Sequence, residues 1–235
     1  MDNDVEIFAK LPNPCAGPLF YTTASEVATR TFVRDVLNIP APRIIAWSAD
    51  RNNPVGAEYI LEEKAPGKPL GSRGPNKPIT DWLTDQPADL LGPLLGRLWQ
   101  DWDIWPMKDR ITMIEQIVEI QRKLASTKFV KSGCIYFRED VPNGTALVTN
   151  PPLRPPILER FTLGPLVEKE LWRDEKASMD MNRGPYESPQ ELVEALAENE
   201  KKFIKAYAHP RMNYARSLTK PESPDDMLDL LDRYL

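Results

Sequence analysis

The sequence is poor in several residue types, and each shortage excludes a class of protein. Its two cysteines, Cys15 and Cys134, fit neither a disulfide framework nor a metal-ligand motif. Lysine and arginine number 30 against 35 aspartates and glutamates, and the formal charge of −5 argues against a general nucleic-acid binder. No apolar run is long enough to cross a membrane, and the acidic start does not fit a secretory signal. We therefore expect a reduced, intracellular protein.

What the sequence does contain is typical of a folded protein with long connections. The 235 residues are 41% apolar and 28% charged, which suits one sizeable core or two unequal lobes. The 24 prolines are about twice the usual share of roughly 5%. Many of them lie between predicted elements, as at 40–42 and 151–156, so they indicate stiff loops rather than a disordered tail.

The first part of the chain predicts strands around one helix. Short apolar runs alternate with turn residues, and one segment shows helical spacing of its apolar residues. The expected strands are 5–11, 43–47 and 58–61, and the expected helix is 23–37. The last strand runs into a hinge-like segment that ends at Gly67.

Beyond Gly67 the pattern is mainly helical, and the expected helices are 109–124, 188–208 and 223–235. Ser188 to Glu191 is a capping box with proline at the first helical position. A small hairpin is expected from 134–137 and 146–148, joined around Asn143-Gly144. The last helix has an apolar face that requires a partner surface.

One segment, 71–96, interrupts this pattern. It is rich in proline and glycine and is flanked by the near-copies Pro69-Leu70-Gly71 and Leu94-Leu95-Gly96. We expect a lineage-specific insertion or a translated intron. Transcript sequencing that found the segment in every mature message would exclude the intron.

Several sequence runs resemble one known family. They are YTTASEVAT (21–29), IPAPRIIAWS (39–48), NPVGAEYI (53–60), SGCIYF (132–137), GPLV (164–167) and NRGPY (182–186). With them the chain resembles the aminoglycoside phosphotransferase family, and within it the fungal branch named for altered inheritance of mitochondria. The resemblance implies an α+β, two-lobed protein-kinase-like fold, incomplete at both ends. Residues 1–66 would form a partial N-lobe on the nucleotide side, and 67–235 a partial helical C-lobe.

The resemblance also implies a nucleotide site. Lys10 matches the strand lysine that contacts the ATP phosphates, and Glu26 matches the helix glutamate that orients this lysine. Glu63 and Ala65 match the hinge positions whose backbone C=O and N–H meet the adenine. The family's catalytic aspartate, its asparagine and its magnesium-binding aspartate have no counterparts, because no His-x-Asp occurs and the single histidine, His209, precedes Pro210. We therefore expect no catalytic or metal-binding residue in this chain.

Each of these residues also has a simpler explanation. A lysine at the end of a strand is often a solvated edge residue. Thr23-x-x-Glu26 is a capping box, in which the glutamate would bond the cap residue instead of Lys10. Glu63 can be an exposed strand end. The sequence leaves these alternatives open.

Three other clusters have structural explanations. Trp99, Trp102 and Trp105 are expected to pack against the core. The aspartates of 225–232 suit the first turns of a solvated helix better than a metal site. The cysteines have no histidine partner in the sequence pattern, which argues against a nucleophilic thiol.

The family's reaction is ATP-dependent phosphoryl transfer to the hydroxyl group of a small molecule, with Mg²⁺ bridging the phosphates. The expected partners are a nucleotide and an unknown small-molecule acceptor, and the resemblance implies a mitochondrial location. Without the catalytic loop the chain is not expected to be a competent kinase. The alternative is a non-catalytic interaction or scaffold protein with a degenerate kinase-like fold. A His-x-Asp motif encoded beyond Leu235 would favour the enzyme, whereas a true stop codon there would favour the scaffold.

Overall fold

The protein is described here from a computed structural model. It covers residues 6–13, 17–65, 106–150, 152–153, 156–213, 215–216 and 218–234. The proposed insertion at 71–96, the three tryptophans at 99–105 and Cys15 lie outside the described residues. The described part is a mixed α and β structure with antiparallel sheets, as expected for an α+β protein.

The first sheet has three antiparallel strands in the order β1-β3-β2, where β1 is Ile7–Lys10, β2 is Ile44–Ser48 and β3 is Tyr59–Glu63. Lys10 lies opposite Ile60 and Ile7 lies opposite Glu63. Strand β3 is therefore central, although it comes last in sequence. Burial alternates along β3 and leaves the side chains of Ile60 and Glu62 buried. This period of two is typical of a strand, but a buried charged side chain such as Glu62 does not follow from it.

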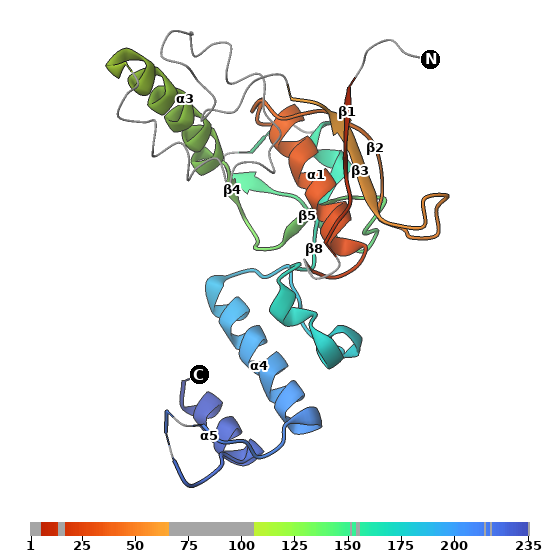
Figure 1. Ribbon diagram of the computed structural model, residues 1–235. Coiled ribbons are helices and arrows are strands. Elements are labelled where there is room, and N and C mark those ends of the chain that lie inside the picture. The colour runs from red at the N-terminus through yellow and green to blue at the C-terminus, as the bar shows by residue number, and fades with distance from the viewer. Residues whose placement is uncertain are drawn as a thin grey trace.

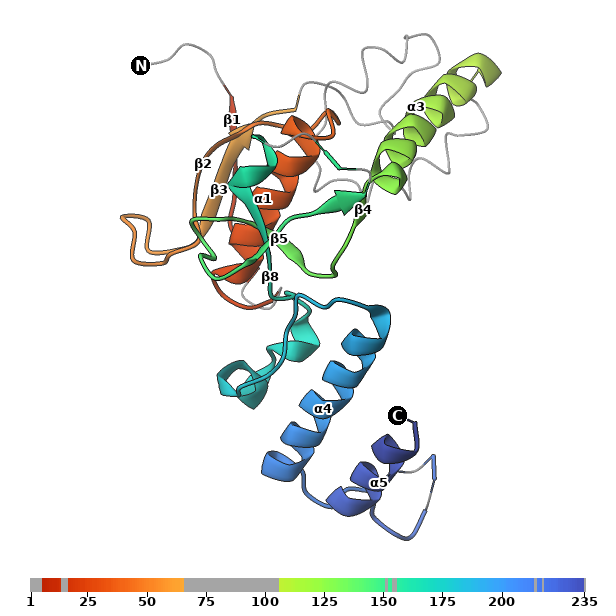
Figure 2. The same ribbon diagram turned by 180° about the vertical axis from the view of Figure 1, so that it is seen from behind.

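Helix α1 (Tyr21–Asp35) packs on this sheet and also contacts β5 (Cys134–Phe137), as Figures 1 and 2 show from opposite sides. The main core joins the helix to the second sheet through buried apolar side chains, which are Ala28, Phe32, Ile135, Leu147, Phe161 and Leu163. Phe32 and Phe161 meet edge to face with their ring centroids 5.5 Å apart. The helix is thus fixed on two sides.

The second three-stranded sheet corrects one prediction. Its order is β5-β8-β6, where β6 is Thr145–Ala146 and β8 is Phe161–Gly164. The expected hairpin between β5 and β6 is wrong, because the fully buried strand β8 lies between them. Gly144 packs so tightly on Thr162 that a Cβ would lie 2.7 Å from its methyl carbon. Gly144 is therefore required for the close packing on Thr162, and Asn143-Gly144 does not form the turn of a two-residue hairpin.

The remaining elements are mostly helical. Helix α3 (Met107–Ser126) leads into β4 (Lys128–Phe129), which pairs with β7 (Thr149–Asn150). Short 3₁₀ helices follow at Leu158–Arg160 (η5), Lys169–Leu171 (η6) and Asp174–Ser178 (η7). Helices α4 (Pro189–Tyr207) and α5 (Pro224–Tyr234) pack on each other and extend away from α1 and the sheets (Figure 1). Among the described residues, no helix combines the length and apolar character needed to cross a membrane.

The predicted cap of α4 is confirmed, and α5 has a similar cap that the sequence analysis did not name. The Ser188 hydroxyl accepts the Glu191 N–H at 3.1 Å. At α5, the Ser223 hydroxyl accepts the Asp226 N–H at 3.1 Å, and Asp226 accepts the Ser223 N–H at 2.9 Å. Within the described residues no group of three His, Cys, Asp or Glu side chains is arranged to hold a metal ion.

Candidate functional site

The candidate site lies where the first sheet faces α1. Successive side chains of a strand point to opposite faces, and opposite residues of an antiparallel pair share a face. Phe8 and Lys10 on β1 therefore share a face with Glu62 and Ile60 on β3. Ile60 and Glu62 are buried, while Lys10 is only partly covered. The lysine thus enters the interface from the rim of the sheet.

Four charged side chains join across this interface. The Lys10 Nζ lies 2.7 Å from the Glu26 Oε1 of α1, which also accepts a longer contact of 3.4 Å from Arg30. Arg30 in turn forms an ion pair with Glu62, whose side chain is only 3% exposed. Two cations and two carboxylates make the network neutral. It is closed at its buried end and open at Lys10 and Glu26, which keep 38% and 30% of their side-chain surface.

The structure rules out the capping box at Thr23. Helix α1 begins at Tyr21, so Thr23 lies inside its first turn, and no side chain of the preceding residue caps it. The Thr23 hydroxyl instead donates a 2.6 Å hydrogen bond to Glu58, which precedes β3. Glu26 is therefore free of any capping role, and its carboxylate binds Lys10 and Arg30.

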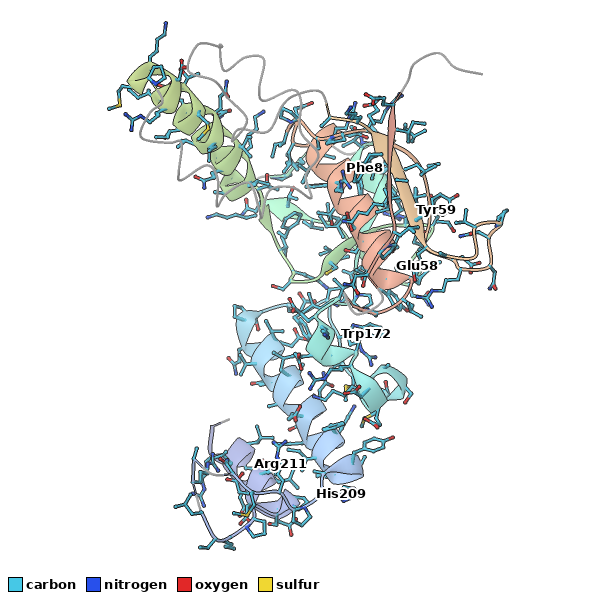
Figure 3. All side chains as sticks on the ribbon, in the orientation of Figure 1. Phe8, Glu58, Tyr59, Trp172, His209 and Arg211 are labelled. Carbon is cyan, nitrogen blue, oxygen red and sulfur yellow. The ribbon has the colours of Figure 1, made fainter. Side chains whose placement is uncertain are left out.

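Glu58 is the cap that the sequence analysis missed. Its carboxylate accepts the Phe20 N–H at 3.2 Å as well as the Thr23 hydroxyl. Glu58 is only 5% exposed, and Figure 3 shows it at the N-terminal end of α1. A negative charge at this place is favourable because the helix dipole leaves partial positive charge there. Arg51 lies 3.7 Å from the same carboxylate.

The predicted hinge residues lie at the far end of β3. Glu63 is three positions beyond Ile60, the partner of Lys10, which amounts to about 10 Å along the strand. The Glu63 N–H donates to the Arg43 carbonyl at 2.9 Å. Its carboxylate lies 2.8 Å from Arg43 and 3.5 Å from Arg34. Partial burial alone would raise the pKa of Glu63. The hydrogen bonds from the Arg43 N–H and guanidinium outweigh this effect and lower the pKa of Glu63 below its ordinary value. Ala65 makes no hydrogen bond within the described residues.

A cavity of about 240 Å³ lies between the segment after β1 and the start of α1. Leu11, Thr22 and Glu58 contribute to its walls, whereas neither Lys10 nor Glu26 lines it. This volume is below the range of about 300–1,000 Å³ that is usual for small-molecule pockets. The cavity is therefore too small to hold a whole nucleotide.

The sequence analysis did not identify two members of the network, Arg30 and Glu62. The sequence contains one pattern that indicates each of them. Glu26 and Arg30 are four residues apart on α1, which places opposite charges side by side on a helix. Side chains two residues apart in an extended segment lie on the same face, as do Glu58, Ile60 and Glu62. The apolar Ile60 indicates that this face is buried, so Glu62 is expected to be buried with it.

The run Asn182 to Tyr186 has a structural role. Asn182 and Asn199 of α4 exchange two hydrogen bonds, at 2.9 and 2.6 Å. The Tyr186 hydroxyl donates to the Asn182 carbonyl at 2.9 Å. Arg183 stacks on Trp172, 3.9 Å from the ring centroid, and donates to the carbonyls of η6 and η7. These contacts tie the 3₁₀ segments to α4.

His209, the single histidine, lies just after α4. Figure 3 shows it beside Arg211 at the far end of that helix, well away from β1 and α1.

Comparison with known proteins shows similarity to longer fungal proteins. A subtelomeric hrmA-associated cluster protein of Aspergillus fumigatus is 35% identical over 186 residues, which are 78% of this chain and 29% of that protein. The mitochondrial altered inheritance of mitochondria protein 9 of Eremothecium gossypii is 28% identical over 76% of this chain and 26% of its own length. The same-named protein of Yarrowia lipolytica is 24% identical over 84% of this chain and 31% of its own length.

These similarities support the resemblance to the fungal altered-inheritance-of-mitochondria branch and a mitochondrial localisation. The chain spans less than a third of the length of the curated relatives it matches. No family model matches the chain, and no solved structure matches it.

Proposed function

We propose that this chain carries the nucleotide-orienting part of a kinase-like phosphotransferase fold. The observation that supports the proposal is the 2.7 Å contact between Lys10 on β1 and Glu26 on α1. A kinase-like site needs a strand lysine that is held by a helix glutamate and points its charge at the nucleotide phosphates. The family pattern implies this pair, and the two residues meet although they lie sixteen residues apart on different elements.

The arrangement of the sheet supports the same proposal. Glu63 ends the central strand β3 and Ala65 follows it, and β3 lies next to the strand that carries Lys10. The separation of about 10 Å between Lys10 and Glu63 along the strand is one that a nucleotide can bridge, with its base at the hinge and its phosphates at Lys10. Lys10 and Glu26 are open enough to be reached by a phosphate, and Mg²⁺ would arrive bound to the nucleotide.

Phosphoryl transfer needs more than this half of the machinery. Its transition state is stabilised by a base for the acceptor hydroxyl and by metal ions held in place by protein ligands. We propose that the chain as given binds nucleotide without appreciable turnover. Transfer from radiolabelled ATP by the purified chain, abolished by Lys10→Ala, would overturn this part of the proposal.

Titration calorimetry with MgATP tests the nucleotide site. We expect saturable binding that Lys10→Ala weakens by about tenfold or more, because hydrogen bonds to charged groups contribute about 1.5–3 kcal/mol. Lys131→Ala is the matched control: Lys131 precedes β5, away from the proposed site, and pairs with the exposed Glu187 at 2.5 Å. The control should bind MgATP as the unaltered chain does. Equal binding by the Lys10→Ala and Lys131→Ala variants would refute the site.

The neutral charge of the network favours a second candidate, a non-catalytic scaffold. In that case Lys10, Glu26, Arg30 and Glu62 act only to fix α1 on the sheet, and no charge remains for a ligand. The calorimetry separates the two candidates. A scaffold would show no MgATP binding, yet Glu62→Gln would still lower its stability.

A further inference from the structure

A larger cavity, of about 560 Å³, lies between the C-terminal half of α1, the start of β2 and the segment after β5. Its volume falls in the range that is usual for small-molecule pockets. It shares no lining residue with the smaller cavity at the start of α1, and none of the residues matched to the nucleotide site lines it. It therefore requires its own explanation.

Arginine dominates the lining of this cavity. Arg34 comes from α1, Arg43 precedes β2, Arg138 follows β5 and Arg160 ends η5. Arg30, the fifth, is already engaged in the network with Glu26 and Glu62. The carboxylates within reach of the other four are Asp35, Glu63 and Glu139. A local excess of positive charge thus occurs in a chain whose formal charge is −5.

Two of these guanidinium groups keep hydrogen-bond donors available. The Arg138 N–H donates to the Arg160 carbonyl at 2.9 Å, which places the two residues next to each other. Within the described residues the Arg138 guanidinium has no hydrogen bond or ion pair, and the nearest carboxylate oxygen of Asp35 is 3.7 Å from Arg160. Guanidinium groups present several donors in one plane and match the oxygens of a phosphate.

Aromatic rings form part of the same wall. Trp47 and Phe137 lie with centroids 6.2 Å apart and planes tilted by 36°. The Arg160 guanidinium carbon is 5.7 Å from the Phe137 centroid. A planar ring can therefore pack against Trp47 and Phe137 while an attached anionic group faces Arg138 and Arg160.

We propose that this cavity binds a small organic phosphate, with its ring against Trp47 and Phe137 and its phosphate at Arg138 and Arg160. A phosphate gains charge-assisted hydrogen bonds from both guanidinium groups. The aromatic side chains add contacts with the ring of an organic phosphate that inorganic phosphate cannot make. The proposed binding contacts differ from those of the nucleotide site, because they do not include Lys10, Glu26, Glu63 or Ala65.

Phenyl phosphate is a suitable probe because it joins one ring to one phosphate. Its binding can be followed by NMR at the indole N–H of Trp47, assigned with Trp47→Phe. We expect a saturable shift with a Kd in about the millimolar range. Inorganic phosphate should bind about tenfold more weakly or not at all. The double variant Arg138→Ala/Arg160→Ala should weaken phenyl phosphate binding by about tenfold or more.

The double variant Arg122→Ala/Arg173→Ala removes the same amount of charge from exposed sites on α3 and before η7, and it should leave binding unchanged. Lys10→Ala should also leave it within about threefold of the unaltered chain. Absence of a saturable shift, equal binding of inorganic phosphate, or equal loss in both double variants would overturn the proposal. Loss of binding in Lys10→Ala would show that phenyl phosphate binds at the Lys10 site instead, which would also overturn the proposal.

Discussion

At the residue scale, the charges between α1 and the first sheet decide how firmly the helix is held. Glu62 is almost completely buried, and Arg30 is its partner. Among the described residues, removing Glu62 would leave Arg30 with only its longer contact of 3.4 Å to Glu26, and breaking a buried pair costs more than the pair itself contributes.

We predict that Glu62→Gln lowers the free energy of unfolding by about 2–4 kcal/mol, as measured by urea denaturation. Glu6→Gln removes a carboxylate from the exposed Lys64 pair and should cost less than about 1 kcal/mol. Similar losses in the two variants would mean that the buried network does not hold the helix.

Asp140, in the turn after β5, gives the stability a pH dependence. Burial, with a smaller contribution from the charge of Glu139, raises the pKa of Asp140 to about 6 from the ordinary 3.8, and its Oδ2 has no hydrogen-bond partner in the part of the chain that the structure describes. Between pH 4 and 6 the folded state therefore binds more protons than the unfolded state. The contribution of Asp140 to stability is greatest below this window and is lost as the pH rises through it.

We predict that Asp140→Asn flattens the stability profile between about pH 4 and 6 and raises stability at pH 7. Urea denaturation across this range tests the prediction, with Asp229→Asn on the surface of α5 as the control. Parallel profiles for the unaltered chain and Asp140→Asn would contradict it.

At the element scale, the two longest capped helices begin in different ways. Helix α4 has a local cap, and its sequence signature predicted it correctly. Helix α1 is capped by Glu58, which lies 35 residues beyond Thr23 in the sequence. A cap of this kind depends on the fold, so local patterns place the start of α1 at Thr23 instead of Tyr21. For the same reason, the local turn Asn143-Gly144 predicted a hairpin that the more distant β8 replaces.

We predict that Ser188→Ala costs about 1 kcal/mol of stability, the usual effect of losing one local cap. Glu58→Ala should cost more, about 2–3 kcal/mol, because it leaves the Phe20 N–H and the Thr23 hydroxyl without their partner. Chemical denaturation of both variants gives the comparison. An equal or smaller loss for Glu58→Ala would show that the carboxylate does not cap α1.

At the scale of the whole molecule, the sequence predicted the first three strands, α1 and the last two helices in the observed order, but it did not predict β8. The meeting of Lys10 with Glu26 was implied by the family pattern alone. The sequence did not predict the partners of Glu62 or the arginine-lined cavity, because those arise where α1, β2 and the segment after β5 converge. The contacts around Arg183 depend in the same way on three separate segments.

We predict that Arg183→Ala loosens the attachment of the 3₁₀ helices η6 and η7 to the run 182–186. Its guanidinium donates hydrogen bonds to the carbonyls of Leu171, Lys176 and Met179 and stacks on Trp172. Its loss should therefore lower the free energy of unfolding by about 2–3 kcal/mol. Hydrogen exchange should rise at 166–186 but not in β1–β3. Unchanged exchange, or the same effect from Arg173→Ala, would contradict this role.

Labelling with an acyl phosphate of ATP tests the central claim most directly, because this reagent acylates a lysine that lies at the nucleotide phosphates. Mass spectrometry should find the acyl group on Lys10, and excess ATP should prevent the labelling. Labelling of Lys64 or other surface lysines alone, or labelling of Lys10 that ATP does not reduce, would contradict the account.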